Sequence, residues 1–218
     1  QAGEVSLAHH GILFLDEFPE FQRAILETLR QPLEDGCVTI ARAHSSVCFP
    51  AEFMLVAAMN PCPCGYYSDP RRPCKCTPPQ IERYLARISG PLIDRIDIHV
   101  TVPAVPFDDL RRQRVGTDSP TMRARVIATR HIQRERFGKS NNLLNGRMGP
   151  RLVRQHCPLT ADCERLLKQA MTELGLSARA HDKVLRLART IADLDGAADI
   201  APEYLSEAIQ YRRLDRQH

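Results

Sequence analysis

The stretch GILFLDE, at residues 11–17, places four consecutive apolar side chains directly before two carboxylates, Asp16 and Glu17. An uninterrupted apolar run is typical of a strand that is buried on both faces of a parallel sheet. The two acids then lie at the carboxyl end of that strand, where open α/β sheets bind their ligands. The sequence therefore predicts a buried strand over Ile12–Asp16 that leads into a polar site.

Two acids in this position are typical of the Walker B element of P-loop NTPases, where the first holds Mg²⁺ and the second polarises the attacking water. Asp16 is thus the candidate Mg²⁺ ligand and Glu17 the candidate catalytic base. The alternative is a strand that simply ends in surface acids. The phosphate-binding motif GxxxxGKS/T, the usual companion of Walker B, occurs nowhere in the 218 residues. The sequence therefore looks like the later part of an ATPase, beginning after the P-loop.

Composition is ordinary for a soluble globular protein of one or two domains, with 43% hydrophobic and 26% charged residues. No apolar stretch is long enough to predict a membrane span. The chain starts at Gln1 without a signal-peptide pattern, so we expect a boundary there and a cytoplasmic location. The net charge of +4 is unevenly divided, because residues 1–110 are acidic and residues 111–218 are Arg-rich and basic. The basic part suits phosphate binding or, equally, a solvated helical face.

Four of the eight cysteines lie close together in the sequence, as Cys62-Pro63-Cys64 and Cys74-Lys75-Cys76. Four thiolates at such spacing can close a tetrahedral structural Zn²⁺ site, although C-x-C is tighter than the usual C-x2-C. Free thiols or a redox pair are the alternatives. Disulfides are disfavoured in the cytosol, so we expect the others to be small buried hydrophobic residues. These are Cys37, Cys48, Cys157 and Cys163.

Apolar periodicity and turn residues predict the remaining elements. The first part should contain a helix from Pro19 to about Gln31, hairpin arms at Cys37–Ile40 and Val47–Phe49, a buried strand at Phe53–Met59, a helix from Pro78 to Ile88 and a strand at Ile96–Val102. The second part should contain helices at Ser119–Phe137 (with Ser119 as the N-cap), from Thr160 to Leu174, from Ser177 to Leu194 and from Pro202. We therefore expect an α/β part over residues 1–110, a basic connector over 111–149 and an all-α part over 150–218.

Asn60 ends the second predicted strand, where the sensor 1 residue of AAA+ ATPases orients the lytic water. The alternative is a turn residue, because Asn before Pro often begins a turn. The tip of the predicted hairpin carries Arg42 and His44 among small residues. A slender basic tip can touch a nucleic-acid backbone, and an ordinary solvated turn is the alternative.

Arginines are the candidate ligands for phosphate groups at a border between subunits. Arg95 lies just before the third predicted strand, from where it can reach a neighbouring subunit's γ-phosphate. A local ion pair with Asp94 or Asp97 is the alternative. Arg179 lies at the start of a predicted helix, where a cation opposes the helix dipole, which suits an anionic ligand or a plain surface position. Arg87 is a further candidate.

Several of these segments together resemble the magnesium-chelatase-like AAA+ proteins of the bacterial ComM (YifB) group. The run VAAMNPCPCG at 56–65 is highly specific. The resembling segments are residues 3–11, which lead into the acidic strand, and then 33–43, 53–65, 83–98 and 177–194. The resemblance extends over nearly the whole chain.

The resemblance implies an α/β plus all-α fold: an incomplete AAA+ P-loop NTPase core, with strands 3 to 5 and a pre-sensor-1 β-hairpin at 37–49, followed by a helical lid. The AAA+ sheet has the order 5-1-4-3-2. The strand at Ile96–Val102 therefore lacks its P-loop neighbour and must pair abnormally, swing out or be completed by another molecule. The resemblance assigns Asp16 and Glu17 to Walker B, Asn60 to sensor 1, Arg95 to the arginine finger and Arg179 to sensor 2.

The function that this family implies is ATP hydrolysis with Mg²⁺ by a homo-hexamer that binds single-stranded or branched DNA and drives branch migration during natural transformation. The full-length protein would add a Lon-protease-like domain and the P-loop, so we expect the present chain alone to be inactive. One alternative is the ATPase subunit of magnesium chelatase, which inserts Mg²⁺ into a porphyrin, although the cysteine cluster is not expected there. Another is a zinc-stapled interaction module without enzymatic activity.

Overall fold

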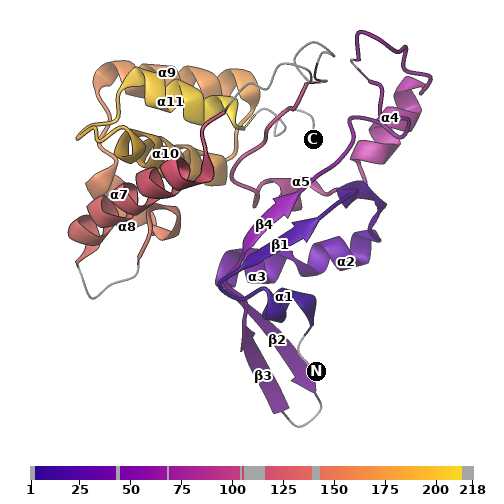
Figure 1. Cartoon of the computed structure of the whole chain (residues 1–218), viewed down its shortest axis with the longest axis horizontal. Helices are drawn as coiled ribbons and strands as arrows, with labels where there is room; N and C mark the ends of the chain where they lie inside the picture. The colour runs from indigo at the N-terminus through magenta and orange to yellow at the C-terminus, as the bar shows by residue number, and fades with distance from the viewer. Residues whose placement is uncertain are drawn as a thin grey trace. The chain divides into compact units, whose positions relative to one another are not determined.

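The computed structural model describes residues 3–42, 45–67, 69–103, 105, 116–138 and 143–212 (Figure 1). The chain divides into two compact units, one up to Ile96 and one from Asp97 onward. The sequence-based boundary at residue 110 and part of the predicted loop after Phe137 lie outside the described residues. No helix among the described residues is both long and apolar enough to cross a membrane.

The first unit contains a parallel pair of strands, β1 (Ile12–Leu15) and β4 (Met54–Ala57). Their register runs from Ile12 opposite Met54 to Leu15 opposite Ala57, and Figure 1 shows them side by side. Both strands were predicted, and each is shorter than the predicted range, which was Ile12–Asp16 for β1 and Phe53–Met59 for β4. The residues that follow them therefore reach the same edge of the sheet.

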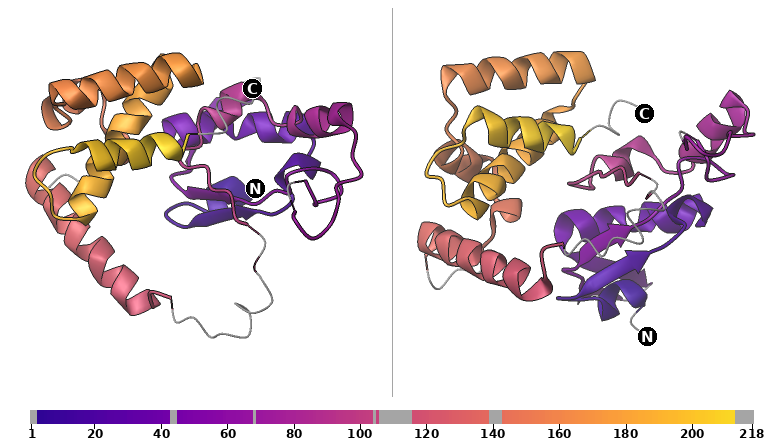
Figure 2. Two further views of the ribbon diagram at one scale, coloured as in Figure 1. Left: turned by 90° about the horizontal axis from the view of Figure 1, so that it is seen from above. Right: turned by 45° about the horizontal axis from the view of Figure 1, so that its top comes forward.

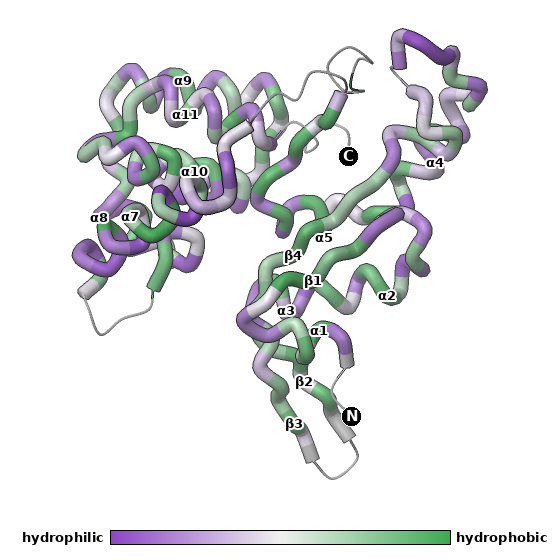
Figure 3. Tube along the Cα trace, in the orientation of Figure 1, coloured by the Kyte–Doolittle hydropathy of each residue, from purple (hydrophilic) through white to green (hydrophobic). Residues whose placement is uncertain are grey.

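The prediction that β1 is buried on both faces is wrong. Ile12 and Phe14 keep 60% and 59% of their surface exposed, while Leu13 and Leu15 on the opposite face are partly covered. Figure 3 shows how hydrophobic both strands are. An apolar strand is buried only when other layers pack against it, and the described residues leave the Phe14 face largely open. The residue types of β1 are therefore those of a buried strand, although one face of the strand is exposed in this chain.

The predicted third strand, Ile96–Val102, does not form a strand in the structure. Val100 and Val102 are exposed, and the His99 backbone N–H donates to the Tyr211 carbonyl at 2.8 Å within the second unit. A strand exists only when a neighbour bonds its backbone groups. The P-loop strand that would be its neighbour in the AAA+ order has no counterpart in this sequence.

Short helices surround the strands of the first unit. The single helix predicted from Pro19 to Gln31 is instead a 3-10 turn, η1 (Phe18–Glu20), followed by two helices. The extended backbone of Gln22 separates η1 from the first helix, and Leu29 lies between the two helices. The helices of this unit are α1 (Glu4–Leu7), α2 (Arg23–Thr28), α3 (Arg30–Asp35), α4 (Pro78–Leu85) and α5 (Gly90–Ile93). Their core side chains include Phe18, Leu26, Leu29, Tyr84, Ile88 and Leu92.

The predicted hairpin is confirmed. Gly36 ends α3 in the left-handed conformation, with φ of 68°, and β2 (Cys37–Arg42) then pairs antiparallel with β3 (Ser45–Pro50). Cys48 is exposed and Cys37 is only partly buried, so the prediction of buried cysteines is wrong here, because a two-stranded hairpin offers little cover.

The regular elements that the structure describes in the second unit are all helices, as predicted. It contains α7 (Ser119–Phe137), η2 (Asn145–Arg147), α8 (Pro150–His156), α9 (Ala161–Leu174), α10 (Ala178–Leu194) and α11 (Pro202–Gln210). Thr160 and Ser177 cap α9 and α10 as predicted, whereas the N-cap of α7 is Asp118 rather than Ser119. α10 contacts α7, α8, η2 and α11. Figure 2 shows the ribbon from two further directions. Cys157 and Cys163 are buried in its core, as predicted.

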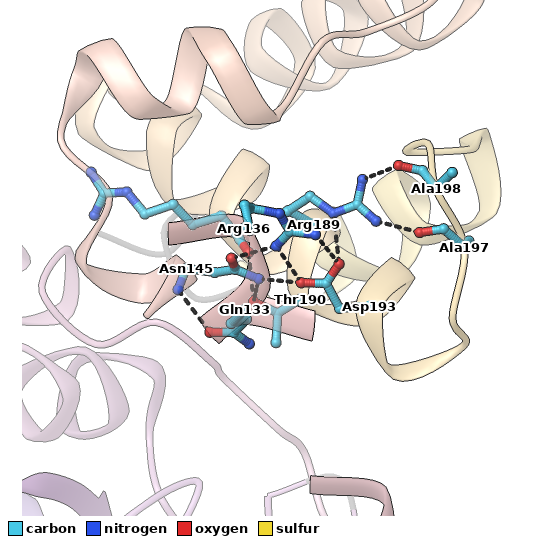
Figure 4. Close-up of polar contacts among 9 residues, drawn as sticks. Gln133, Arg136, Asn145, Arg189, Thr190, Asp193, Ala197 and Ala198 are labelled. Carbon is cyan, nitrogen blue, oxygen red and sulfur yellow. Dashed lines mark hydrogen bonds and ion pairs between the residues drawn. The ribbon is translucent and has the colours of Figure 1, made fainter. Parts of the chain in front are cut away.

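A buried polar network joins α7, η2 and α10 (Figure 4). Asp193 accepts hydrogen bonds from Arg136 (2.6 and 2.5 Å), from Arg189 Nε (3.0 Å) and from Asn145 Nδ2 (2.7 Å). Arg189 also donates to the carbonyls of Ala197 and Ala198. Because Asp193 and Arg189 are each 2% exposed, their charges are tolerated only through these partners. The network therefore fixes the long α7 against the helical core.

His156 makes the stability of this unit depend on pH. Burial, and secondarily the positive charge of Arg136, lowers the pKa of His156 below its ordinary value. The unfolded chain then binds this proton more readily than the folded chain. We expect the free energy of unfolding to decrease as the pH falls below about 6.5, the ordinary histidine value, and the loss to be complete below the folded pKa. Urea unfolding at a series of pH values measures this, and a His156→Gln variant with the same pH slope as the parent would contradict it.

Candidate functional site

Asp16 and Glu17 follow β1 at the edge of the sheet and are both exposed. The Glu17 backbone adopts the left-handed conformation, with φ of 51° and ψ of 44°, and its N–H donates to Asp16 Oδ1 at 2.9 Å. The next residue, Phe18, is buried and donates its N–H to the Ala58 carbonyl at 3.0 Å. A left-handed residue other than glycine costs about 1–3 kcal/mol and is concentrated at functional sites. The strand end thus aims the Glu17 carboxylate in a direction that a regular strand does not permit.

Asn60 lies at the same edge, because it follows β4 and β4 is the parallel neighbour of β1. A backbone hydrogen bond connects Asn60 with the hydroxyl of Tyr84, a buried residue of α4. Burial, followed by the charge of Glu20, raises the pKa of that hydroxyl. The fold therefore brings the two acids and Asn60 to neighbouring strand ends.

Arg95 follows α5 in the first unit, and only 12% of its side chain is exposed. Its guanidinium pairs with Glu34 of α3, with Nε at 3.0 Å from Oε2, and its Nη1 donates to the Pro91 carbonyl at 2.7 Å. Sequence reasoning considered only local acids and missed Glu34, because no sequence pattern links residues 61 positions apart. The guanidinium is thus held beside a partly exposed carboxylate.

Arg87 lies beside the turn that follows the two acids. Its Nη1 lies 2.6 Å from Glu20 Oε2 and 3.2 Å from the Pro19 carbonyl, both in the turn after Glu17. The sequence analysis did not identify Glu20 as a partner of an arginine either. Its position three residues after Glu17 was the only indication in the sequence that it lies near the acids. Arg87 therefore connects the region after α4 to the turn that carries the acids.

The other candidate residues lie elsewhere. Arg179 is in the first turn of α10, in the second unit, and is exposed. Arg42 ends β2, opposite Ser45 in the hairpin, and its side chain is not described. His44 lies outside the described residues.

The four clustered cysteines come together in space, in the loop between β4 and α4. Their sulfur atoms all lie within 4.8 Å of one another. The backbone N–H groups of Tyr66 and Lys75 are the main reason that the pKa of Cys64 is lowered to about 6. The Cys76 N–H favours the Cys74 thiolate, but burial and the neighbouring sulfurs outweigh it and raise the pKa of Cys74 to about 12. The cluster thus offers four soft ligands to one metal ion.

Comparison with known proteins gives two family matches that together span most of the chain. Residues 1–110 match the family described as magnesium chelatase, subunit ChlI, and residues 116–212 match the C-terminal family of the same subunit. The division between the two matches falls close to the predicted end of the α/β part.

Individual relatives show the same similarity. The chain is 45% identical over 215 residues to competence protein ComM of Haemophilus influenzae and 44% identical over 215 residues to protein YifB of Salmonella typhimurium. Each alignment covers 98% of this chain and 41% of the relative, so the chain spans less than half of their length. The magnesium-chelatase subunit ChlI of Chlorella vulgaris is 25% identical over 211 residues, which cover 96% of this chain and 52% of the relative. The chain belongs to the magnesium-chelatase-like family of AAA+ ATPase-related proteins and is of the ComM/YifB type.

Proposed function

We propose that this chain forms the later part of the nucleotide-hydrolysing core, together with the helical lid, of a hexameric AAA+ ATPase that acts on DNA. The observation that carries the proposal is the adjacent placement of Asp16, Glu17 and Asn60 at the carboxyl ends of two parallel strands. Nucleotide sites of open α/β sheets lie at this edge. The left-handed backbone of Glu17 supports the same proposal, because such strained conformations are concentrated at ligand-binding and active sites.

The residues at the edge fit the roles of a hydrolytic site. The exposed Asp16 carboxylate offers the hard oxygen ligands that Mg²⁺ prefers. Bound Mg²⁺ would supply charge neutralisation for the phosphates. Glu17 would accept a proton from the attacking water, and the Asn60 amide would orient that water. The phosphate-binding loop would come from sequence outside this chain.

Arg95 would act on the nucleotide of a neighbouring subunit, and Arg179 would contact phosphate from the lid. To do so, Arg95 must exchange Glu34 for a phosphate oxygen. The Glu34 side chain is 50% exposed, so water can hydrate its carboxylate when the ion pair breaks. A γ-phosphate carries more charge than a carboxylate and can compete for the guanidinium. The pair with Glu34 therefore suits a resting position for the arginine finger.

DNA is proposed as the partner because the named relative ComM is a competence protein and because basic groups are available. The hairpin β2–β3 would place Arg42 and His44 against the nucleic-acid backbone. The Arg-rich second unit could add contacts with phosphates. The second candidate function is the ATPase subunit of magnesium chelatase, which the matches to the ChlI families favour. The higher identity to ComM, 45% against 25% for ChlI, favours the DNA role.

The test is ATP hydrolysis by the full-length protein with and without branched DNA. We expect DNA to stimulate hydrolysis. Arg42→Ala should weaken DNA binding and should reduce the slope of the logarithm of the binding constant against the logarithm of the salt concentration by about one, the value for one lost phosphate contact. Arg23→Ala, which removes an exposed arginine of α2 outside the hairpin, is the matched control and should leave the DNA response unchanged. Hydrolysis that is indifferent to DNA would contradict the DNA role and favour the chelatase-type function.

A further inference from the structure

The loop between β4 and α4 holds a cluster that the proposed ATPase chemistry does not use. It contains Cys62, which is fully buried, and Cys64, Cys74 and Cys76, which are partly buried. Three sulfur–sulfur distances are 3.4 Å (Cys62 to Cys64), 3.7 Å (Cys62 to Cys74) and 3.6 Å (Cys64 to Cys74). The cluster is therefore compact although its two halves are separated by nine residues of chain.

These sulfur–sulfur distances match those around one kind of bound metal ion. Four sulfurs around Zn²⁺ at about 2.3 Å form a tetrahedron whose edges measure about 3.8 Å. A disulfide would instead need a sulfur–sulfur distance of about 2.05 Å. Hard cations such as Mg²⁺ and Ca²⁺ take oxygen ligands and not thiolates. The sulfur geometry thus favours a soft, tetrahedral metal ion.

The backbone around the sulfurs is arranged to stabilise thiolates. The Cys76 N–H donates to Cys74 Sγ at 3.4 Å, and the N–H groups of Tyr66 and Lys75 bond with the Cys64 sulfur. Groups of this kind orient metal ligands and offset their negative charge. Gly65, with φ of 80°, permits the tight turn in which its N–H donates to the Cys62 carbonyl at 3.0 Å.

We propose that Cys62, Cys64, Cys74 and Cys76 bind one Zn²⁺ ion in a closed structural site. Four protein ligands leave no coordination position for water or substrate, so the ion has no catalytic part. Its effect is on the chain itself. Cys62 follows Asn60 by two residues, and Cys76 directly precedes Thr77, the N-cap of α4. The ion therefore joins the end of β4 to the start of α4 and restrains the backbone that carries Asn60.

The experiment measures metal in the purified 218-residue chain, prepared without chelators. Elemental analysis should find one equivalent of zinc per chain. Cys64→Ser should reduce the zinc content at least several-fold, whereas Cys48→Ser, which alters an exposed cysteine of β3, should leave it unchanged. Because Cys64→Ser could also misfold, Co²⁺ should be exchanged into the unaltered chain. The expected result is the strong charge-transfer absorption and the visible bands of tetrahedral thiolate-bound Co²⁺.

Three outcomes would overturn the site: zinc below half an equivalent, iron as the bound metal, or a mass that shows disulfides among the four cysteines. Octahedral Co²⁺ bands would contradict the tetrahedral geometry. None of these measurements involves nucleotide or DNA. A failure of the metal site is therefore distinguishable from a failure of the proposed ATPase function.

Discussion

Glu17→Gln should lower ATP hydrolysis by the full-length protein roughly 10²- to 10⁴-fold, the usual contribution of a positioned general base. Gln keeps the shape of the side chain and the left-handed turn but cannot accept a proton from water. ATP binding should persist, because Asp16 still offers its carboxylate to Mg²⁺. Steady-state release of phosphate and equilibrium binding of a fluorescent nucleotide measure the two effects separately.

Glu52→Gln is the matched control. Glu52 is an exposed acid that precedes β4, at the opposite end of the sheet from Glu17, and its ion pair with His10 is long, at 3.9 Å. Its removal should change hydrolysis little. If Glu17→Gln hydrolyses ATP as fast as the parent, the Walker B assignment of this turn is wrong.

A mixture of variants tests whether Arg95 acts across a subunit border. Glu17→Gln and Arg95→Ala subunits should each be inactive alone. In a mixed ring with head-to-tail borders, about a quarter of the borders would combine an intact Glu17 with an intact Arg95 from the neighbour. Hydrolysis should therefore return on mixing. No recovery, in rings shown to exchange subunits, would place Arg95 in its own subunit's site or outside catalysis.

Asp193→Ala should destabilise the helical unit by about 3–5 kcal/mol, because removing one partner of a buried ion pair leaves the other charge uncompensated. Here two arginines are affected. Arg189 is almost fully buried and keeps only the carbonyls of Ala197 and Ala198, while Arg136 loses its anchor on α10. Chemical denaturation followed by circular dichroism measures the change. The backbone amides of α7 should also exchange their hydrogens faster in the variant.

Asp162→Ala removes an exposed ion pair with Arg165 and is the comparison for Asp193→Ala. Exposed pairs of this kind contribute at most about 1 kcal/mol, so its effect should be small. Asp193→Asn should lie between the two, because the amide retains an acceptor for Arg136 but not the charge. An Asp193→Ala variant as stable as Asp162→Ala would show that the network does not hold α7 in place.

Local patterns predicted the elements whose stability is local or nearly so. The caps at Thr160 and Ser177 were correct because an N-cap depends on residues within one helical turn. The hairpin was correct because its two strands are close in sequence and pair with each other. The cysteine cluster was visible as spacing, since its four sulfurs come from one loop. The helix predicted after Pro19 was wrong because an extended Gln22 interrupts a periodic apolar pattern.

By itself, the sequence determined the parallel strands β1 and β4, the hairpin, the main helices of the second unit, the acids after β1 and the resemblance to a ComM-type protein. Only the tertiary structure decided that Glu34 holds Arg95, that Asp193 gathers Arg136, Arg189 and Asn145, and that Ile96–Val102 forms no strand. The reason is that the type of a residue indicates which kind of partner it requires, apolar or of opposite charge, but not which distant segment of the chain provides that partner. Burial and ion pairing depend on partners many residues away, so they are settled only when the chain has folded.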